Sequence, residues 1–304
     1  MPTRMNKLFG PVAALLFAAL LFEPCPAEAA AGGVKIDLRI HGGYSRLAAG
    51  DVNTGSGGLY EFYKLFAEYG DYTYEGGYEP LHGGADAGAD VIFLLSRRFG
   101  IGIGVGFLRS AGDADMTLIP PDSETMVFDG RSALSAFPIR LGLYYSLPLV
   151  GKLSLTANAG GAFYAGLRFK DRFHVEAGSV FSTQEITATR TSLSKNLGFQ
   201  GGLGFEYDVS PRMGVFVEAQ GRYARFENFG SASIYLASAE GGSDTREGKI
   251  YLRTQTLSTD PLIVFNMYQV ESTPPSPDPP DLVIREPKFD LSGFCLQMGI
   301  RIRL

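Results

Sequence analysis

The chain has 304 residues with 27 Lys and Arg against 32 Asp and Glu, and the resulting net charge of −5 argues against nucleic acid as a partner. Its 39 glycines are nearly twice the average share of about 7%, yet they follow no Gly-X-Y period, which excludes collagen. Beyond the first residues, no apolar stretch approaches the roughly 20 residues that a membrane-spanning helix needs.

The N-terminal segment has the pattern of a secretory signal. Arg4 and Lys7 precede a charge-free apolar run at 12–22, and Ala27 and Ala29 supply the small residues of a cleavage site. We therefore expect a cleaved signal over residues 1–29 and a single domain over residues 30–304. The alternative is that the segment stays in place as a membrane anchor, although its apolar run is short for that.

The two cysteines give little support for covalent chemistry. Cys25 could suggest a lipoprotein, but Phe22-Glu23-Pro24 before it is a poor match to the small residues that such a site needs, and we expect Cys25 to leave with the signal. The remaining chain then keeps Cys295 alone, so no disulfide can form within it. Its stability must come from backbone pairing and burial.

Apolar residues alternate with small or polar ones along most of the chain, and this period of two predicts β-strands. The clearest run has Phe99, Ile101, Ile103, Val105 and Phe107 separated by single glycines. Several runs exceed ten residues, which is enough for a tilted strand to cross a bilayer. In chain order the predicted strands cover residues 34–40, 89–95, 99–107, 139–145, 153–169, 197–207, 213–223 and 294–304.

The connections between these strands alternate strictly in length. Three are tight, at 96–98, 148–152 and 208–212, and four are long, at roughly 46–84, 111–131, 170–194 and 227–288. Short periplasmic turns and long extracellular loops are typical of outer-membrane barrels. A closed barrel also satisfies every backbone group in a membrane without a helix. The sequence therefore predicts an all-β fold, a closed antiparallel transmembrane β-barrel of about eight strands with both ends of the chain in the periplasm.

Strand parity predicts which side chains point into the barrel. The interior of an eight-stranded barrel is just wide enough for side chains, and glycines on the inward face leave room for long ones. Charges in so narrow a space should pair, so we expect a plugged or very narrow lumen. A β-bulge would reverse the parity of its strand. The inward charges are Asp37, Arg39, Asp90, Arg140, Arg168, Glu206, Glu218, Arg222 and Arg301.

A soluble β-sandwich or a lipocalin-like barrel would also show alternation. Neither needs outward rows of long aliphatic and aromatic residues, and neither needs charges that point inward. Both features favour the membrane barrel.

The first long loop is rich in tyrosine and acidic residues. Leu59, Phe62, Tyr63 and Phe66 are spaced as on one face of a short amphipathic helix. Tyr60, Tyr63 and Phe66 are candidates for contacts with a partner over the barrel mouth, since tyrosine offers area and a hydrogen bond at low entropic cost. The alternative is a segment that simply rests on the barrel rim.

Two other long loops have distinctive compositions. The second long loop is acidic, with Asp113 and Asp115 among its carboxylates, but it lacks the spacing of an EF-hand loop, and we expect no metal and no cofactor. In the last long loop, 250–256 and 262–270 are β-prone and predict a hairpin that protrudes above the membrane. The proline-rich stretch after it, 274–280, predicts extended chain.

The last residues carry a recognisable ending. Gln297, Gly299 and Ile302 match the polar, glycine and hydrophobic positions of the terminal assembly signal of outer-membrane barrels, while Leu304 stands where phenylalanine is usual. With the strand count and the loop pattern, the chain resembles the small outer-membrane barrels of the OmpA/OmpX/OmpW type. The resemblance implies an outer-membrane location, contact with outer-membrane lipid and insertion by the barrel assembly machinery. It implies no particular activity.

The sequence leaves the function open among three hypotheses. The leading one is a structural or surface-binding barrel with a plugged lumen and an unknown external ligand. The second is a narrow channel for small molecules, hydrophobic ones included, and the third is a barrel enzyme that modifies lipids. Because His41, His82 and His174 show no spacing typical of a catalytic triad, we expect no catalytic residues and no enzyme.

Overall fold

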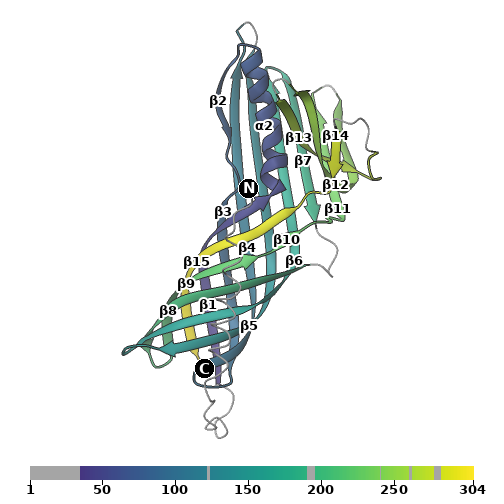
Figure 1. Ribbon diagram of the computed structural model, residues 1–304. Helices are drawn as coiled ribbons and strands as arrows, with labels where there is room; N and C mark the ends of the chain where they lie inside the picture. Colours follow the sequence, from purple (N-terminus) through teal and green to yellow (C-terminus); the bar gives the residue numbers. More distant parts are fainter. Residues whose placement is uncertain (1–34, 122–123, 190–195, 240, 260–261, 277–281) are drawn as a thin grey trace.

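The computed structural model describes residues 35–121, 124–189, 196–239, 241–259, 262–276 and 282–304 (Figure 1). The expected signal, residues 1–29, lies outside this part of the chain. Within it, strands dominate and one long helix is present, α2 (Asp51–Tyr69). No helix among these residues is long and apolar enough to cross a membrane.

Eight antiparallel strands close into a ring at the end of the molecule where the chain terminates (Figure 1). Every neighbour in the ring is antiparallel, and β6 pairs with β8 to close it. All eight strands expected from the alternation of the sequence lie in this ring. In ring order they are β1 (Lys35–Gly50), β3 (Gly83–Leu94), β4 (Phe99–Ile119), β5 (Met126–Pro148), β6 (Leu153–Ala177), β8 (Leu197–Ser210), β9 (Met213–Tyr223) and β15 (Phe289–Arg303).

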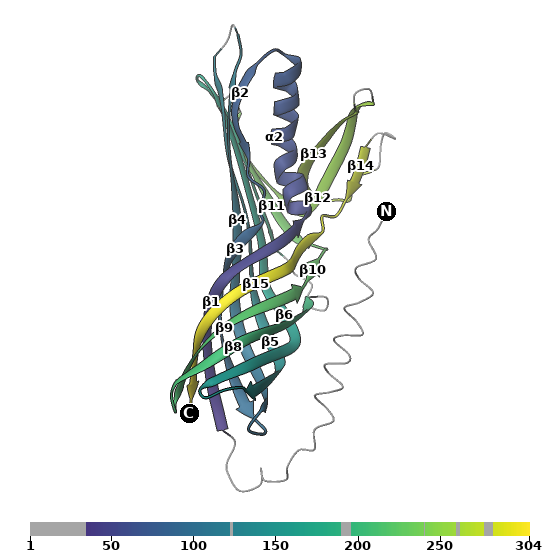
Figure 2. The ribbon, with the colours of Figure 1, turned by 60° about the vertical axis from the view of Figure 1, so that its left-hand side comes forward.

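Three ring strands are much longer than the ring needs. The outer halves of β4, β5 and β6 continue beyond it as a wall, which Figure 2 shows rising above the ring. The first half of β6 pairs with β8 and the second half with β7, so β6 changes its partner between the ring and the wall. We call this wall and the elements attached to it the extension.

The extension is a curved sheet with a helix along its open side. Helix α2 packs against β13 and β2, which lie at opposite ends of the curved sheet (Figures 1 and 2). The remaining strands are β2 (Thr73–Tyr78), β7 (Val180–Thr189), β10 (Arg225–Phe226), β11 (Ser231–Ser238), β12 (Gly242–Thr259), β13 (Leu262–Glu271) and β14 (Leu282–Arg285).

The helix predicted around Leu59–Phe66 is confirmed, and it is longer than the amphipathic pattern indicated. Its first half is rich in glycine because the neighbouring sheet lies very close. A Cβ on Gly58 would lie 2.2 Å from the backbone oxygen of Asn266, and one on Gly55 would lie 2.3 Å from the ring of Tyr268. These contacts fix the helix against β13.

The long loops expected from the sequence are mostly strand. The stretch 111–131 is a continuation of the β4–β5 hairpin, and 170–194 is largely β6 and β7. The hairpin expected at 250–256 and 262–270 is present as β12 and β13. The extra strands form because alternation continues past the ring and buries its apolar residues beneath α2, as Ala114, Met116 and Leu118 show.

Candidate functional site

The inward side chains of β1 organise the interior of the ring in four layers. Asp37, Arg39, His41 and Ser45 are all at most 5% exposed, and each contacts polar residues from other strands. Because alternate residues of a strand share a face, these positions follow one another along the ring axis. The inward glycines leave space for the layers, since a Cβ on Gly104 would lie 1.8 Å from Asp90 Oδ1.

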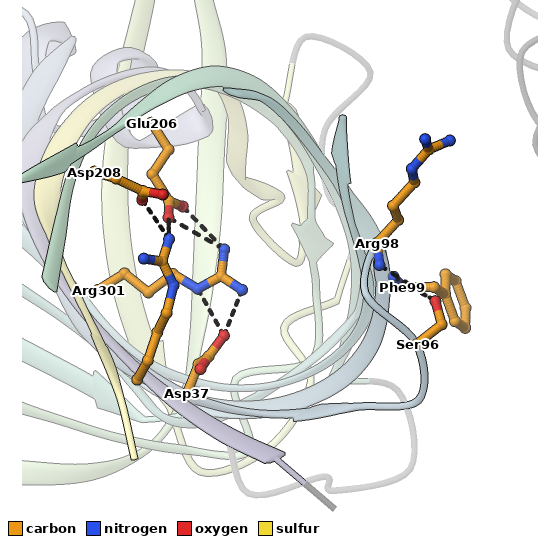
Figure 3. Close-up of polar contacts among 8 residues, drawn as sticks. Asp37, Ser96, Arg98, Phe99, Glu206, Asp208 and Arg301 are labelled. Atoms are coloured by element: carbon orange, nitrogen blue, oxygen red, sulfur yellow. Dashed lines mark hydrogen bonds and ion pairs between the residues drawn. The ribbon is translucent and has the colours of Figure 1, made fainter. Parts of the chain in front are cut away.

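The first layer lies at the end of the ring near the C-terminus (Figure 3). Arg301 donates from Nε to Asp37 Oδ2 at 2.7 Å and from Nη1 to Glu206 Oε2 at 3.0 Å. Arg303 donates from Nη2 to Glu206 Oε1 at 2.8 Å and also pairs with Asp208. Two arginines and three carboxylates thus form one network across the bore.

The second layer centres on a buried glutamate. Arg39 donates to Glu218 Oε2 at 3.0 Å, and the side-chain amide of Gln297 donates to Glu218 Oε1 at 2.8 Å. The Arg39 guanidinium also stacks over the Phe216 ring, 3.8 Å from its centroid. Glu218 is 1% exposed, so its charge is balanced within the protein rather than by water.

The third layer joins residues of four strands around a histidine. Arg140 Nη2 lies 3.0 Å from Asp90 Oδ1 and 2.8 Å from His41 Nε2, and it also donates to the carbonyl oxygen of Val105 at 3.1 Å. His41 Nε2 also lies 3.5 Å from Asp90 Oδ2, so the imidazole is packed between the arginine and the carboxylate.

The fourth layer is closed by Arg222. Its Nη1 donates to Asp86 Oδ2 at 2.8 Å, and its Nε donates to the carbonyl oxygen of Leu291 at 3.0 Å. The Ser45 hydroxyl donates to the same Asp86 oxygen at 3.0 Å. In every layer a buried arginine therefore faces at least one carboxylate.

Above the fourth layer the interior becomes apolar. A cluster of fully buried side chains fills the passage from the ring to the extension, including Leu108, Leu134, Phe169, Phe226 and Phe289. Near the first layer, a cavity lined by Arg39, Tyr144, Glu206 and Arg301 measures about 20 Å³. That volume is close to the space that one water molecule needs.

Arg168 does not lie in the interior of the ring, so the prediction that it is a lumen charge was wrong. Register shifts between Ser135 and Phe137 of β5, opposite Arg168 and Ala165 of β6, which is a β-bulge. Gly166 at the bulge adopts a positive φ of 60°. The extra residue reverses the parity of β6, so Leu167 points inward and Arg168 is exposed on the outer face.

The other eight expected lumen charges are buried inside the ring: Asp37, Arg39, Asp90, Arg140, Glu206, Glu218, Arg222 and Arg301. Sequence reasoning missed further polar partners on the same inward face, among them Ser45, Asp86, Asp208 and Arg303. Parity could have found Asp86, since it lies four residues before Asp90 on one strand.

A second polar cluster lies in the extension beneath α2. The hydroxyl of Ser132 donates to Asp171 Oδ1 at 2.6 Å, and burial raises the pKa of the Asp171 carboxyl above its ordinary value. Tyr60 is 4% exposed, and its hydroxyl has no hydrogen-bond partner among the described residues. These groups line a cavity of about 20 Å³ together with Ser56, Tyr78 and Tyr268.

The three contact candidates of the first long loop lie in different environments. Tyr60 is buried and stacks on Tyr78, so it is not available to an external partner, and that expectation was wrong. Tyr63 packs against Phe128, with ring centroids 4.5 Å apart. Phe66 is 50% exposed near the end of the helix. The amphipathic face of α2 therefore serves mainly to cover the sheet.

The residues of the expected assembly signal all lie on or beside β15. Gln297 belongs to the second layer, and Gly299 allows close approach, since its Cβ would lie 2.1 Å from the Ile40 carbonyl oxygen. Ile302 pairs with Leu38, and the Leu304 amide donates to the Ile36 carbonyl oxygen at 2.9 Å. Their role in assembly stays a prediction.

Comparisons with known proteins give a weak likeness to solved structures. No family model and no curated protein matches the chain. Among the solved structures that match is the crystal structure of the outer membrane protease OmpT from Escherichia coli, with a TM-score of 0.34 and 10% identity over 91% of this chain and 100% of that chain. That neighbour is an outer-membrane protein but not one of the OmpA/OmpX/OmpW type.

This finding corrects the expectation that the chain is not an enzyme. A solved structure that matches it is that of a protease, so the spacing of three histidines was too narrow a ground for excluding activity. At this TM-score and identity, the likeness transfers no activity, substrate or residue role to the chain.

Proposed function

We propose that the ring is a transmembrane β-barrel of the bacterial outer membrane, sealed inside, which anchors the extension on the cell surface as a binding structure. The observation that carries the proposal is the inversion of polarity in the ring. Its buried interior holds charges, while its exposed face holds large apolar side chains. A water-soluble protein has the opposite arrangement.

The apolar face forms a continuous belt around the ring. On β4 it runs from Phe99 to Phe107, and on β9 from Met213 to Tyr223. Nine residues of strand, tilted by about 40°, span roughly 20 Å, close to the apolar band of about 25 Å in outer-membrane barrels. Exposed aromatic residues border the belt, with Tyr44, Phe137 and Tyr223 on the extension side.

The sealed interior supports an anchor rather than a channel. Four layers of paired charges and an apolar layer follow one another in the bore, and opening any layer would leave a buried charge without its partner. Breaking such a pair costs about 3–5 kcal/mol. The ring gains a fixed shape from these contacts.

The extension supports a binding role on the side of the membrane opposite the termini. Its outer face carries Asp113, Asp129 and Arg131 in place of the apolar belt, as expected for a surface in water. At the end of α2, Phe66 and Tyr69 are 50% and 62% exposed. Large exposed aromatic side chains are typical of contact sites. Insertion of the ring into the membrane would require the barrel assembly machinery. The binding partner of the extension would be a ligand outside the cell.

Reconstitution of the full chain tests this proposal. We expect the protein to float with phospholipid vesicles after alkaline washing and to leave planar bilayers without steady single-channel openings. Protease added outside the vesicles should cut the extension before the ring. A chain that stays in solution would refute the membrane anchor, and steady openings in the unmodified protein would refute the sealed interior and favour the channel.

A further inference from the structure

We propose that two arginines on the outer face of the extension, Arg109 and Arg168, together bind the phosphate of a lipid headgroup in the outer leaflet. This inference rests on the proposed function, because only a ring embedded in a membrane brings lipid to these residues. The two side chains come from β4 and β6, and both are exposed. We call them the arginine pair.

The register of the sheet places the arginine pair on one level. Arg109 pairs with Ser135 of β5, and Ser135 pairs with Arg168 of β6, so the three residues form one row across three strands. Neighbouring strands lie about 4.8 Å apart, which puts the two arginine Cα atoms about 10 Å from each other. A phosphate above Ser135 would lie between both guanidinium groups.

This row directly follows the edge of the apolar belt. Phe107 precedes Arg109 on the same outer face, and its ring packs against Phe137 with centroids 5.1 Å apart. Both rings belong to the belt that would face acyl chains. Headgroup phosphates lie just outside the acyl region, so the arginine pair occupies the level of the phosphates.

The bulge in β6 gives a second, independent reason. Without the extra residue, Arg168 would point into the ring, where Leu167 now fills the space. Bulges often redirect one side chain at the rim of a barrel. Here the bulge places a positive charge on the outer face beside the belt and keeps the interior apolar at that level.

Both arginines are available for a ligand. Neither side chain makes a hydrogen bond or an ion pair with another residue in the described part of the chain. Further out on the same face, Arg131 is paired with Asp113 at 3.3 Å.

On β4, β5 and β6, the charges nearest the belt on this outer face are all positive. The row of the arginine pair and the next row hold Arg109, Arg168 and Lys170 without a carboxylate on β4, β5 or β6, although Lys170 reaches Glu185 of β7. The third row mixes Asp113 with Arg131 and Arg172, and Asp115 and Asp129 follow in the fourth. Positive charge in the rows next to the apolar belt complements a layer of anionic headgroups.

Guanidinium groups suit this ligand chemistry. Arginine binds phosphate through two parallel N–H donors, whereas a lysine offers a point charge. The Ser135 hydroxyl, between the two arginines, adds a donor from the sheet itself. A lipid with a terminal phosphate monoester fits the site better than one whose phosphate is covered by choline.

Native mass spectrometry of the full chain in detergent can measure the binding. The probes are phosphatidic acid, phosphatidylcholine with matched acyl chains, and inorganic phosphate. The test variant is Arg109→Gln with Arg168→Gln, and the matched control is Arg131→Gln with Arg172→Gln, which removes the same charge from a facing pair of exposed arginines four residues further from the belt on β5 and β6. Arg109→Lys with Arg168→Lys keeps the charge but loses the forked donors.

We expect the unmodified chain to prefer phosphatidic acid over phosphatidylcholine and to bind inorganic phosphate too weakly to detect. Each basic residue near an anionic surface changes affinity about fivefold, so the glutamine pair should weaken binding of phosphatidic acid roughly 25-fold. The control should stay within about twofold of the unmodified chain, and the lysine pair should fall between the two.

Three results would overturn the proposal: equal affinity for both lipids, an equal loss in the test and control variants, or equally tight binding of inorganic phosphate. Flotation with vesicles is measured on the same preparations. If the chain floats but the arginine pair has no effect, this inference alone fails. If the chain does not enter vesicles, the proposed anchor fails and this inference fails with it.

Discussion

Replacing Glu218 by glutamine tests whether the layers inside the ring exclude water. The glutamine keeps the shape of the side chain but removes the charge that faces Arg39 at 3.0 Å. The substitution also replaces one carboxylate oxygen by an NH₂ group. This donor would face either the Arg39 guanidinium or the side-chain amide of Gln297, which are donors themselves. Since Arg39 is 4% exposed, its charge would remain buried without a partner, at a cost of about 3–5 kcal/mol in the free energy of unfolding.

The assay is urea unfolding of the protein in lipid vesicles, followed by circular dichroism because the sequence contains no tryptophan. A matched control is Arg246→Gln, which breaks an exposed ion pair with Asp244 and should cost less than about 1 kcal/mol. Glu218→Gln combined with Arg39→Gln should recover about half of the loss or more, because both charges are then gone. If Glu218→Gln costs no more than the control, water reaches this layer and the sealed interior is refuted.

Three further changes probe the apolar layer, the helix contact and the buried acid. Phe169→Ala should lower the free energy of unfolding by about 3–5 kcal/mol in the same assay, since the ring is fully buried above the fourth layer; a loss below 1 kcal/mol would mean that this layer is loosely packed. Gly58→Ala should cost about 1–3 kcal/mol by pushing α2 from Asn266 and should speed amide exchange in β13, whereas Thr54→Ala on the exposed side of the same helix should change neither. Asp171→Asn should stabilise the extension by on the order of 1 kcal/mol at pH 7. The pKa of Asp171 is raised by burial, so its stabilising contribution is present below the unfolded pKa and is lost as the pH rises through the folded pKa. The stabilisation of Asp171→Asn relative to the unmodified chain should therefore disappear near pH 3. An equal stabilisation at pH 7 and at pH 3 would contradict a raised pKa of Asp171.

The ring was predictable from the sequence because two simple rules coincide there. Alternation identifies each strand, and inward glycines such as Gly104 mark where a neighbouring charge such as Asp90 needs room. Eight of the nine expected lumen charges obey this parity. Arg168 does not, because the bulge depends on the register of β5 against β6, and no local feature of the sequence fixes that register. Gly166 was the visible signal, but one glycine among many carries little information.

The extension was predictable in parts and not as a whole. Alternation continues through Ala114, Met116 and Leu118, but the neighbouring Asp113 and Asp115 made the stretch resemble a solvated loop. These carboxylates lie on the face that water covers, and the apolar residues lie under α2. The helix itself was visible from its apolar spacing, while its partner β13 lies about 200 residues further along the chain. Pairing over that separation depends on tertiary packing, which a local pattern does not report.

The continuation of β4, β5 and β6 from the ring into the extension connects the parts of the molecule mechanically. A strand that is held on both sides by the sheet cannot rotate independently, so the extension is fixed to the ring by three strands rather than by flexible linkers. Such strands carry their hydrogen bonds across the membrane edge, where a loop would expose unpaired backbone groups. The same continuity forces the change from a closed ring to an open sheet to occur within β6, which pairs with β8 below the bulge and with β7 above it. The bulge therefore serves the fold by redirecting the strand at the point where its partner changes, and it serves the proposed lipid site by turning Arg168 outward at the edge of the belt.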